Sequence, residues 1–237
     1  MTRSGGDRRH TVPFDPDHFS RAAAEPADAL TKFRMIYRTN FWSGPASRSG
    51  AGSDLEQTAA IRTELPELLR RWSIRSLLDL PCGEGSWMAT VDLGPVEYLG
   101  ADLVPEVVAA NRARGDGRSY LELDLTTSPL PAVDLLFCRD CLVHLSTADI
   151  RRALANVRRA GIRYLLTTTF PDEPTNLDIV TGDWRPLNLE RPPFGFPPPI
   201  DRIVERCTEG GGLFADKSLG LWRVAELPDR DGTAAPS

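Results

Sequence analysis

Residues 76–88 read Ser76-Leu-Leu-Asp-Leu-Pro-Cys-Gly-Glu-Gly-Ser-Trp-Met88, and this stretch decides the fold. It starts with an apolar run that carries Asp79 and ends in a turn that contains Gly83 and Gly85. Apolar residues followed by turn formers indicate a buried strand that runs into a loop. Two glycines one residue apart let the backbone pass close to a ligand, where a Cβ atom would collide with it. The stretch therefore predicts a ligand site at the end of a strand.

A second short apolar run ends at Asp102, nineteen residues beyond Gly83. In a βαβ unit this spacing places a carboxylate at the tip of the second strand, where it can accept hydrogen bonds from both ribose hydroxyls of an adenosine. A nicotinamide dinucleotide would use the same carboxylate, but its fingerprint needs a third glycine where this chain has Met88. Asp79, and Asp124 after the third strand, add carboxylates that suit a cation and repel a pyrophosphate. The predicted cofactor is adenosyl and positively charged.

With these features the chain resembles the class I S-adenosylmethionine-dependent methyltransferases. The resemblance covers about residues 70–225, and it implies S-adenosyl-L-methionine as the cofactor and methyl transfer as the reaction. It rests on the motifs Asp-Leu-Pro-Cys-Gly-Glu-Gly at 79–85, Gly-Ala-Asp at 100–102, Leu-Asp-Leu at 123–125 and Asp-Leu-Leu-Phe-Cys-Arg-Asp at 134–140. Pro81 and Cys82 depart from the family pattern, in which many members have a small residue or glycine first, so the subfamily stays open.

The resemblance assigns cofactor contacts to individual residues. The two glycines of the turn would wrap the methionine moiety, and Asp102 would hold the ribose. Asp124 would meet the adenine amino group, while Leu103 and Leu125 would sandwich the adenine ring. Arg139 could pair with the methionine carboxylate. The cofactor-binding residues expected in this part of the chain are Asp79, Pro81, Cys82, Gly83, Gly85, Asp102, Leu103, Asp124, Leu125 and Arg139.

Strand and helix patterns alternate along the chain. The pattern predicts strands at about 76–80, 98–101, 119–123, 133–138 and 163–169, and helices near 85–91, 104–114 and 146–160. This alternation predicts an α/β fold with a doubly wound, mostly parallel, Rossmann-like sheet that binds ligands at the carboxyl ends of its strands. A strand pair in 200–226 would bring the sheet to seven strands. Ser146-Thr-Ala-Asp149 is a capping-box pattern that opens the last of the three helices.

Residues 12–72 predict an N-terminal helical cap or lid in front of a cofactor-binding domain at 73–228. One helix is expected at 26–38. A second is expected to run from the capping-box pattern at Ser53 to about Trp72, and Pro66 should kink or divide it. The two ends of the chain, 1–11 and 229–237, are interpreted as disordered tails.

Residues 40–53 connect the two helices of the cap and are rich in glycine and serine. We interpret them as a lid segment over the cofactor, with Trp42 and Arg48 as its contact residues. The alternative is a surface loop in which Trp42 only fills a gap.

Residues 181–199 follow the fifth strand and are too rich in proline for a long helix. Aspartate, tryptophan, arginine and asparagine alternate here, and such residues are costly to bury without polar partners. In doubly wound methyltransferases this position borders the acceptor pocket. The predicted substrate-binding residues are Asp183, Trp184, Arg185, Asn188, Phe194 and Phe196. A structural cover over the sheet edge is the alternative.

The loop after the fourth strand, 139–144, holds the candidates for catalysis. Methyl transfer from a sulfonium is a single displacement, so alignment of the attacking atom contributes most. A hydroxyl acceptor also needs a base, whereas an amine acceptor only needs to be neutral. His144, the only histidine inside the predicted domain, and Asp140 are the predicted catalytic residues. The alternatives are a histidine bound to backbone at a helix entry and a carboxylate that caps the next helix.

Charge and motifs favour a small-molecule acceptor. The net charge of −5 does not suit a large nucleic-acid footprint, and no Asn/Asp-Pro-Pro-Tyr/Phe motif follows the fourth strand. No run approaches the ~18 apolar residues of a membrane span, and the N-terminus has no secretory signal pattern, so we expect a cytoplasmic protein. Cys138 and Cys141 resemble half of a zinc site but lack a second pair, so no metal is expected. A nucleic-acid or protein acceptor and a catalytically silent adenosyl-binding protein stay open, as do oxygen versus nitrogen methylation and the oligomeric state.

Overall fold

The computed structural model describes residues 11–22 and 27–228. Apart from Thr11, the tails predicted at 1–11 and 229–237 lie outside the described residues. Within the described part of the chain, no helix is both long and apolar enough to cross a bilayer.

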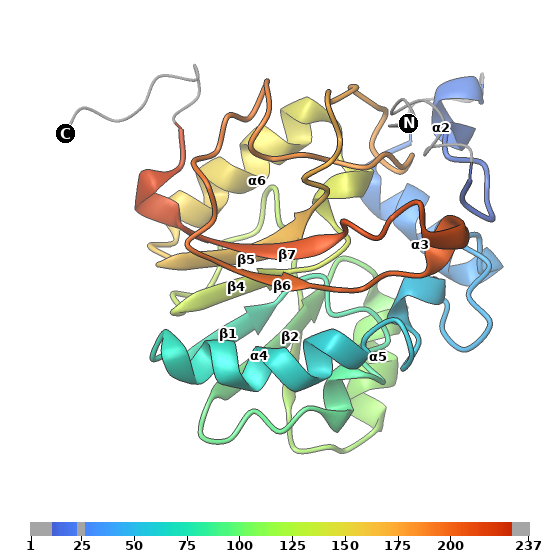
Figure 1. The fold of residues 1–237 in the computed structure, drawn as a ribbon. Helices are drawn as coiled ribbons and strands as arrows, with labels where there is room; N and C mark the ends of the chain where they lie inside the picture. Colours follow the sequence, from blue (N-terminus) through green and yellow to red (C-terminus); the bar gives the residue numbers. More distant parts are fainter. Residues whose placement is uncertain (1–10, 23–26, 229–237) are drawn as a thin grey trace.

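A seven-stranded sheet with the order β3-β2-β1-β4-β5-β7-β6 forms the centre of the molecule, as predicted (Figure 1). Strands β1 to β5 are parallel, and β7 runs antiparallel to both of its neighbours. The strand order changes direction at β1, which pairs with β2 on one side and β4 on the other. Ligands of doubly wound sheets bind at such a switch point. The strands are β1 Ser76–Asp79, β2 Glu97–Asp102, β3 Ser119–Glu122, β4 Leu135–Cys138, β5 Tyr164–Thr169, β6 Asp201–Val204 and β7 Ser218–Arg223.

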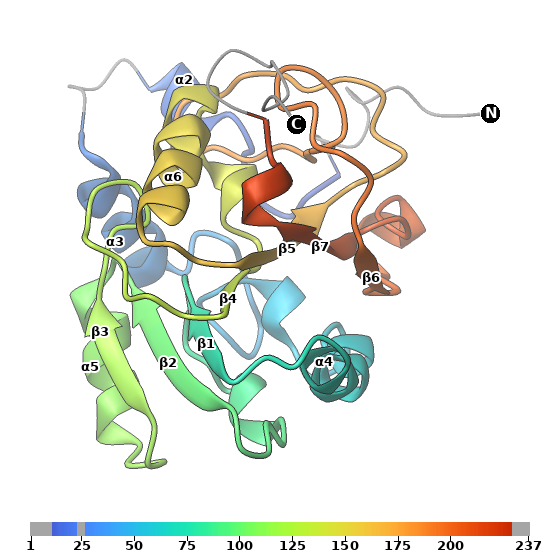
Figure 2. The ribbon, with the colours of Figure 1, turned by 90° about the vertical axis from the view of Figure 1, so that its left-hand side faces the viewer.

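Helices cover both faces of the sheet, which explains why its central strands are apolar on both sides. Leu78 and Leu136 point into the cluster that packs on α6, whereas Leu77 and Leu135 point into the cluster that packs on α4. Figure 2 shows α6 and α4 on opposite sides of the sheet. The α-helices are α2 His18–Arg21, α3 Ala29–Thr39, α4 Ala59–Arg71, α5 Pro105–Ala113 and α6 Thr147–Arg159, and 3₁₀ turns occupy Ala51–Ser53, Met88–Thr90, Leu142–His144, Glu209–Gly212 and Val224–Glu226.

The N-terminal region divides into two parts. Helix α4 lies within the predicted cap, but its apolar side packs against the sheet. Helix α3 instead lines the cavity described below.

Two predictions about helices are wrong. The helix expected at 85–91 is only the turn Met88–Thr90, because Gly85 adopts a left-handed backbone with φ 59°. The capping-box pattern at Ser53 does not open α4, because the Ser53 hydroxyl donates to the Ser49 carbonyl and the helix begins after Thr58. Pro66 lies inside α4 without dividing it.

The second capping-box pattern is confirmed. The Ser146 side chain accepts a hydrogen bond of 3.1 Å from the backbone N–H of Asp149 at the start of α6. The same four-residue pattern therefore caps one helix and fails at the other.

Ser146→Ala should destabilise the protein by about 1 kcal/mol, because it removes the acceptor for a backbone N–H in the first turn of α6. This corresponds to a fall of about 2–4 °C in the melting temperature measured by calorimetry. Ser53→Ala is the matched control and should change the stability by less than about 0.5 kcal/mol. Equal effects of the two substitutions would contradict the assignment of the cap.

Candidate active site

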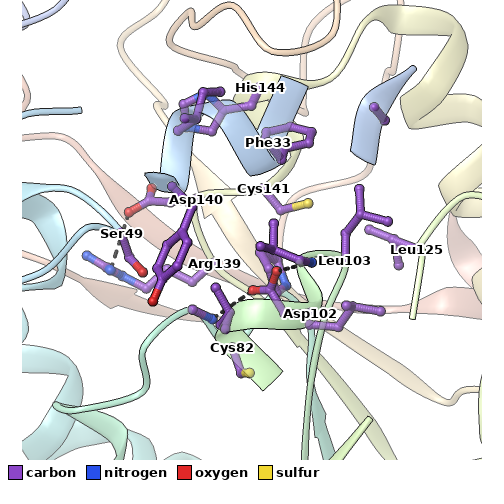
Figure 3. A pocket seen from close by; sticks show the side chains of 18 of the residues that line it. Phe33, Ser49, Cys82, Asp102, Leu103, Leu125, Arg139, Asp140, Cys141 and His144 are labelled. Carbon is purple, nitrogen blue, oxygen red and sulfur yellow. Dashed lines mark hydrogen bonds and ion pairs between the residues drawn. The ribbon is translucent and has the colours of Figure 1, made fainter. Parts of the chain in front are cut away.

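A cavity of about 150 Å³ lies where β1, β2 and β4 end, at the predicted edge of the sheet. Its wall combines the loops after these strands with helix α3 and the segment 40–53 (Figure 3). Most of the predicted cofactor-binding residues line it: Trp42, Arg48, Asp79, Pro81, Cys82, Gly83, Asp102, Leu103, Asp124, Leu125 and Arg139.

Asp102 lies at the end of β2, and its carboxylate is held by the backbone on both sides. One oxygen accepts from Gly83 N at 3.0 Å and the other from Val104 N at 2.9 Å. Burial raises the pKa of Asp102 to about 6, although these hydrogen bonds oppose the shift. The glycine turn and the predicted ribose carboxylate thus form one unit.

Asp79, at the end of β1, is a second buried carboxylate in the cavity wall. It accepts a hydrogen bond of 2.7 Å from the Tyr98 hydroxyl, and burial raises its pKa to about 7. Among the described residues, neither Asp79 nor Asp102 has a cation within ion-pair distance. Two desolvated carboxylates without a cationic partner suit a positively charged ligand.

The segment 40–53 is docked on the glycine turn. The Ser49 hydroxyl accepts from Glu84 N at 3.1 Å, and Arg48 N donates to the Glu84 carboxylate at 3.1 Å. Gly83 has φ 53°, and a Cβ atom there would lie 2.6 Å from the Ser49 hydroxyl oxygen. Gly83 therefore allows the close approach of this segment as well as of a ligand.

Gly85 does not line the cavity, which corrects its predicted cofactor contact. A Cβ atom at Gly85 would instead lie 3.1 Å from a guanidinium nitrogen of Arg114. The second glycine serves the left-handed turn and its packing against Arg114.

Trp42 and Arg48, the predicted contacts of the lid segment, both face the cavity. The Trp42 ring stacks on His144 with a centroid distance of 4.5 Å and an interplanar angle of 30°. The Arg48 guanidinium lies 5.4 Å from the centroid of the Tyr37 ring of α3 and has no ion pair in the described part of the chain.

The predicted adenine contacts lie together at the ends of β2 and β3. Leu103 and Leu125 both line the cavity (Figure 3). Asp124 lines it too, but its carboxylate accepts from Thr126 N at 2.7 Å and from the Thr127 hydroxyl at 2.9 Å. This carboxylate therefore also stabilises the loop to which it belongs.

Arg139 is committed to a carboxylate that the sequence analysis missed. Its guanidinium makes two hydrogen bonds to Glu205, of 3.2 and 2.7 Å, and donates to the Gly52 carbonyl at 2.9 Å. Both charged side chains are almost fully buried, so each needs the other. Arg139 also lines the cavity, and its predicted pairing with the methionine carboxylate stays a prediction.

Lys217 extends this pair into a network of four charges. It contacts Asp140 at 2.7 Å and Glu205 at 3.5 Å, and Arg139 lies 3.3 Å from Asp140. Burial alone would raise the pKa of Asp140, but Lys217 and Arg139 outweigh it and hold this pKa well below its usual range. The sequence carried one signal for this role, since Lys217 is one of only two lysines in the chain.

His144 is buried and neutral at pH 7. Burial lowers its pKa to about 4. Its Nδ1 lies 3.0 Å from the carbonyl oxygen of Asp183, which can only accept, so Nδ1 carries the hydrogen and Nε2 carries the lone pair. The loop after β4 thus presents a basic nitrogen and an ionised carboxylate.

A second cavity of about 90 Å³ adjoins the first, and the two share Trp42, Ser49, Asp140 and His144. This volume is several times what one water molecule needs. The other residues of its wall are Val12, Gly50, Ala51, Gly52, Phe170, Trp184, Cys207, Glu209, Phe214 and Lys217.

Of the predicted substrate-binding residues, only Trp184 lines either cavity. Phe194 and Phe196 are buried in the cluster that packs on α6. The Asp183 carboxylate accepts from Phe19 N at 2.7 Å and Ser20 N at 3.1 Å, so it holds helix α2.

Arg185 and Asn188 bind backbone carbonyls. Arg185 donates to Leu142 O at 2.9 Å and Leu145 O at 2.8 Å, and Asn188 donates to Pro171 O and Glu173 O at 2.9 Å each. The prediction that Asp183, Arg185, Asn188, Phe194 and Phe196 line the acceptor site is corrected. Backbone groups satisfy the buried polar residues, so their burial needs no ligand.

Residues 77–161 match the family model of a methyltransferase domain. The matched residues lie in the part of the chain that resembles the class I S-adenosylmethionine-dependent methyltransferases, and they support that resemblance. The match also agrees with S-adenosyl-L-methionine as the predicted cofactor.

Solved structures support the same fold. The chain is similar to 1,6-didemethyltoxoflavin-N1-methyltransferase of Burkholderia thailandensis, solved with 1,6-didemethyltoxoflavin and S-adenosylhomocysteine, at 16% identity and a TM-score of 0.55 over 85% of this chain and 92% of the other. Magnesium protoporphyrin IX methyltransferase of Synechocystis PCC 6803, with bound S-adenosylmethionine, matches at 14% identity and a TM-score of 0.48 over 63% and 79%. The match to the sugar N-methyltransferase KedS8 of Streptoalloteichus has 23% identity and a TM-score of 0.44, and it covers 62% of this chain and 57% of that one. The chain likewise spans 59% of the PH0226 protein of Pyrococcus horikoshii. No curated protein sequence matches the chain.

The cavity fits the predicted cofactor, S-adenosyl-L-methionine. S-adenosylmethionine carries a sulfonium and an ammonium group, and the wall offers the buried carboxylates of Asp79 and Asp102, neither of which has a cation within ion-pair distance in the described part of the chain. Leu103 and Leu125 contribute apolar side chains to the wall, which suit an adenine ring.

Asp79→Asn should stabilise the ligand-free methyltransferase at pH 8 and have little effect on its stability at pH 4. A carboxyl group whose pKa is higher in the folded than in the unfolded state costs folding free energy as the pH rises from about 4 to 7, and the full cost is present above pH 7. Asparagine removes this cost and can still accept from Tyr98. We expect a gain of about 1–3 kcal/mol at pH 8 in urea unfolding. A pH-independent effect would contradict the assignment.

Proposed function

We propose that the enzyme transfers the methyl group of S-adenosylmethionine to an oxygen or nitrogen atom of a small molecule that binds in the second cavity. The observation that carries this proposal is the shared wall of the two cavities, in which Asp140 and His144 face both the cofactor side and the acceptor side. The size of the second cavity and the net charge of −5 support a small acceptor over a nucleic acid.

On the cofactor side, Asp102 would bind the ribose hydroxyls and Asp79 the cationic end of the methionine moiety. Arg48 would take the role first predicted for Arg139, because its guanidinium has no ion pair among the described residues and faces the cavity. Leu103 and Leu125 would enclose the adenine ring.

When bound, the cofactor supplies an electrophilic methyl group. His144 Nε2 would accept a hydrogen bond from the O–H or N–H group of the acceptor and so point its lone pair toward that methyl group. For a hydroxyl acceptor, the proton would pass to Nε2 while the oxygen forms its bond to carbon. Asp140, kept ionised by Lys217 and Arg139, would stabilise the imidazolium that forms.

Trp42 would exclude water from the reacting groups. Its ring covers His144, and residues of the same segment bind the glycine turn through Ser49. A site closed in this way favours alignment of the acceptor over hydrolysis of the sulfonium.

Asp102→Ala should weaken the binding of S-adenosylmethionine about tenfold to a hundredfold in isothermal titration calorimetry, because hydrogen bonds to a charged group contribute about 1.5–3 kcal/mol. Asp92→Ala, which changes an exposed aspartate far from the cavity wall, is the control and should leave the affinity unchanged. An unaltered affinity of the Asp102 variant would refute the cofactor site.

His144→Phe should lower turnover of a hydroxyl acceptor about 10²–10⁴-fold and leave cofactor affinity almost unchanged. Phenylalanine keeps a ring beneath Trp42 but removes the nitrogen lone pair. With an amine acceptor the loss should appear mainly in KM. Because the pKa of His144 is about 4, wild-type turnover should show no titration of this group between pH 6 and 8. The test is transfer of a labelled methyl group to a metabolite panel that includes small nitrogen heterocycles. Full turnover of the variant would remove His144 from the mechanism.

A further inference from the structure

We propose that the acceptor carries a positively charged amino group and that Glu209 binds this group in the second cavity. The proposal rests on the proposed function, because it takes the second cavity as the acceptor site. It adds the charge of the acceptor to that function, whereas the roles of His144 and Asp140 concern only the acceptor atom that receives the methyl group.

The charges at the second cavity do not balance. Arg139 and Lys217 each lie within ion-pair distance of both Asp140 and Glu205, so these two cations and two carboxylates balance one another. Glu209 is a third carboxylate beside this network, and it lines the second cavity together with Asp140 and Lys217. Two cations against three carboxylates leave one negative charge in excess.

Among the described residues, Glu209 makes no ion pair at contact distance, although its charge acts on Lys217 and Arg139 from farther away. The hydrogen bond that its carboxylate accepts within the described part of the chain comes from the Cys207 thiol, at 3.5 Å, while the ion pairs of Lys217 are with Asp140 and Glu205. A thiol is a weak donor, so most of the hydrogen-bonding capacity of this carboxylate is left for a ligand.

The space in front of Glu209 is open because residue 52 is glycine. A Cβ atom on Gly52 would lie 3.3 Å from Glu209 Oε2 and 3.5 Å from both Asp140 Oδ2 and Lys217 Nζ. Two carboxylates, Glu209 and Asp140, and the ammonium group of Lys217 therefore converge on one point of the cavity, where the negative charges outnumber the positive one. A side chain at position 52 would fill this space.

The rest of the wall strengthens the attraction for an ammonium group. Phe170, Trp184 and Phe214 pack edge to face, with centroid distances of 5.4 to 6.4 Å. Aromatic rings attract cations, and an apolar wall reduces the screening of an ion pair. The same cavity disfavours an anion, because Lys217, the one cation among the described residues of its wall, is already held by two carboxylates.

The test compares three probes of the same size and different charge: cyclohexylamine, cyclohexanol and cyclohexanecarboxylate. Their binding to the full-length enzyme saturated with S-adenosylhomocysteine is measured by ligand-observed NMR at pH 7.5. We expect the amine to bind about tenfold more tightly than the alcohol and the carboxylate to bind most weakly. Equal affinities of the three probes would overturn the proposal.

Two substitutions test whether Glu209 is the group that makes the amine bind more tightly than the alcohol. Glu209→Gln should remove the advantage of the amine and leave the alcohol unchanged, whereas Glu226→Gln, a change at an exposed glutamate paired with Arg223, should alter neither. Gly52→Ala should weaken the amine in the same way, because its methyl group occupies the space in front of Glu209. An amine preference that survives both substitutions would overturn the assignment to Glu209. Thermal melts and S-adenosylhomocysteine affinity verify that each variant is folded.

The methyl-transfer assay separates this proposal from the proposed function. Cationic acceptors whose kcat/KM falls about tenfold or more in Glu209→Gln would support both proposals. A small acceptor without a positive charge, used equally well by the Glu209→Gln enzyme, would overturn the charge assignment and leave small-molecule methylation intact. Methylation only of a protein or an RNA would overturn both.

Discussion

The active-site end of this fold depends on a buried ion-pair network that joins segments far apart in the chain. Arg139 and Asp140 follow β4, Glu205 follows β6, and Lys217 precedes β7. Arg139 also donates to the carbonyl of Gly52 and so joins the segment 40–53 to the sheet. Loss of one partner in a buried pair costs about 3–5 kcal/mol, because the other charge is left without compensation. The network therefore fixes the relative positions of a strand end, a hairpin and the segment that covers the cofactor cavity.

Most of the sheet and the carboxylates that line the first cavity could be predicted because their signals are local. An apolar run marks a strand, and an acidic residue at its end marks the carboxyl edge of a parallel sheet. Asp79 and Asp102 were identified in this way, and both line the cavity. The closing antiparallel pair, β6 and β7, followed from a partly alternating pattern near the end of the chain.

The surroundings of the second cavity could not be predicted because their contacts join distant residues. Glu205 and Lys217 lie 66 and 77 residues from the residues they bind, and nothing near them in the sequence indicates a partner. Arg185 and Asn188 were misinterpreted for a related reason. A polar residue that will be buried looks like a ligand-binding residue until its partner is known, and here the partners are backbone carbonyls, which every residue supplies. The two capping-box patterns show the same limit of the sequence. The Ser53 hydroxyl donates to a backbone carbonyl, whereas the Ser146 hydroxyl accepts from a backbone N–H and caps its helix.

The shared wall of the two cavities has a consequence for the order of events in a catalytic cycle. Trp42 and Ser49 border both cavities, and Ser49 is hydrogen-bonded to the glycine turn. A displacement of Trp42 and Ser49 would alter the walls of both cavities at once. If the two cavities hold the cofactor and the acceptor as proposed, access to the two sites is coupled, and the exchange of one ligand would loosen the site of the other.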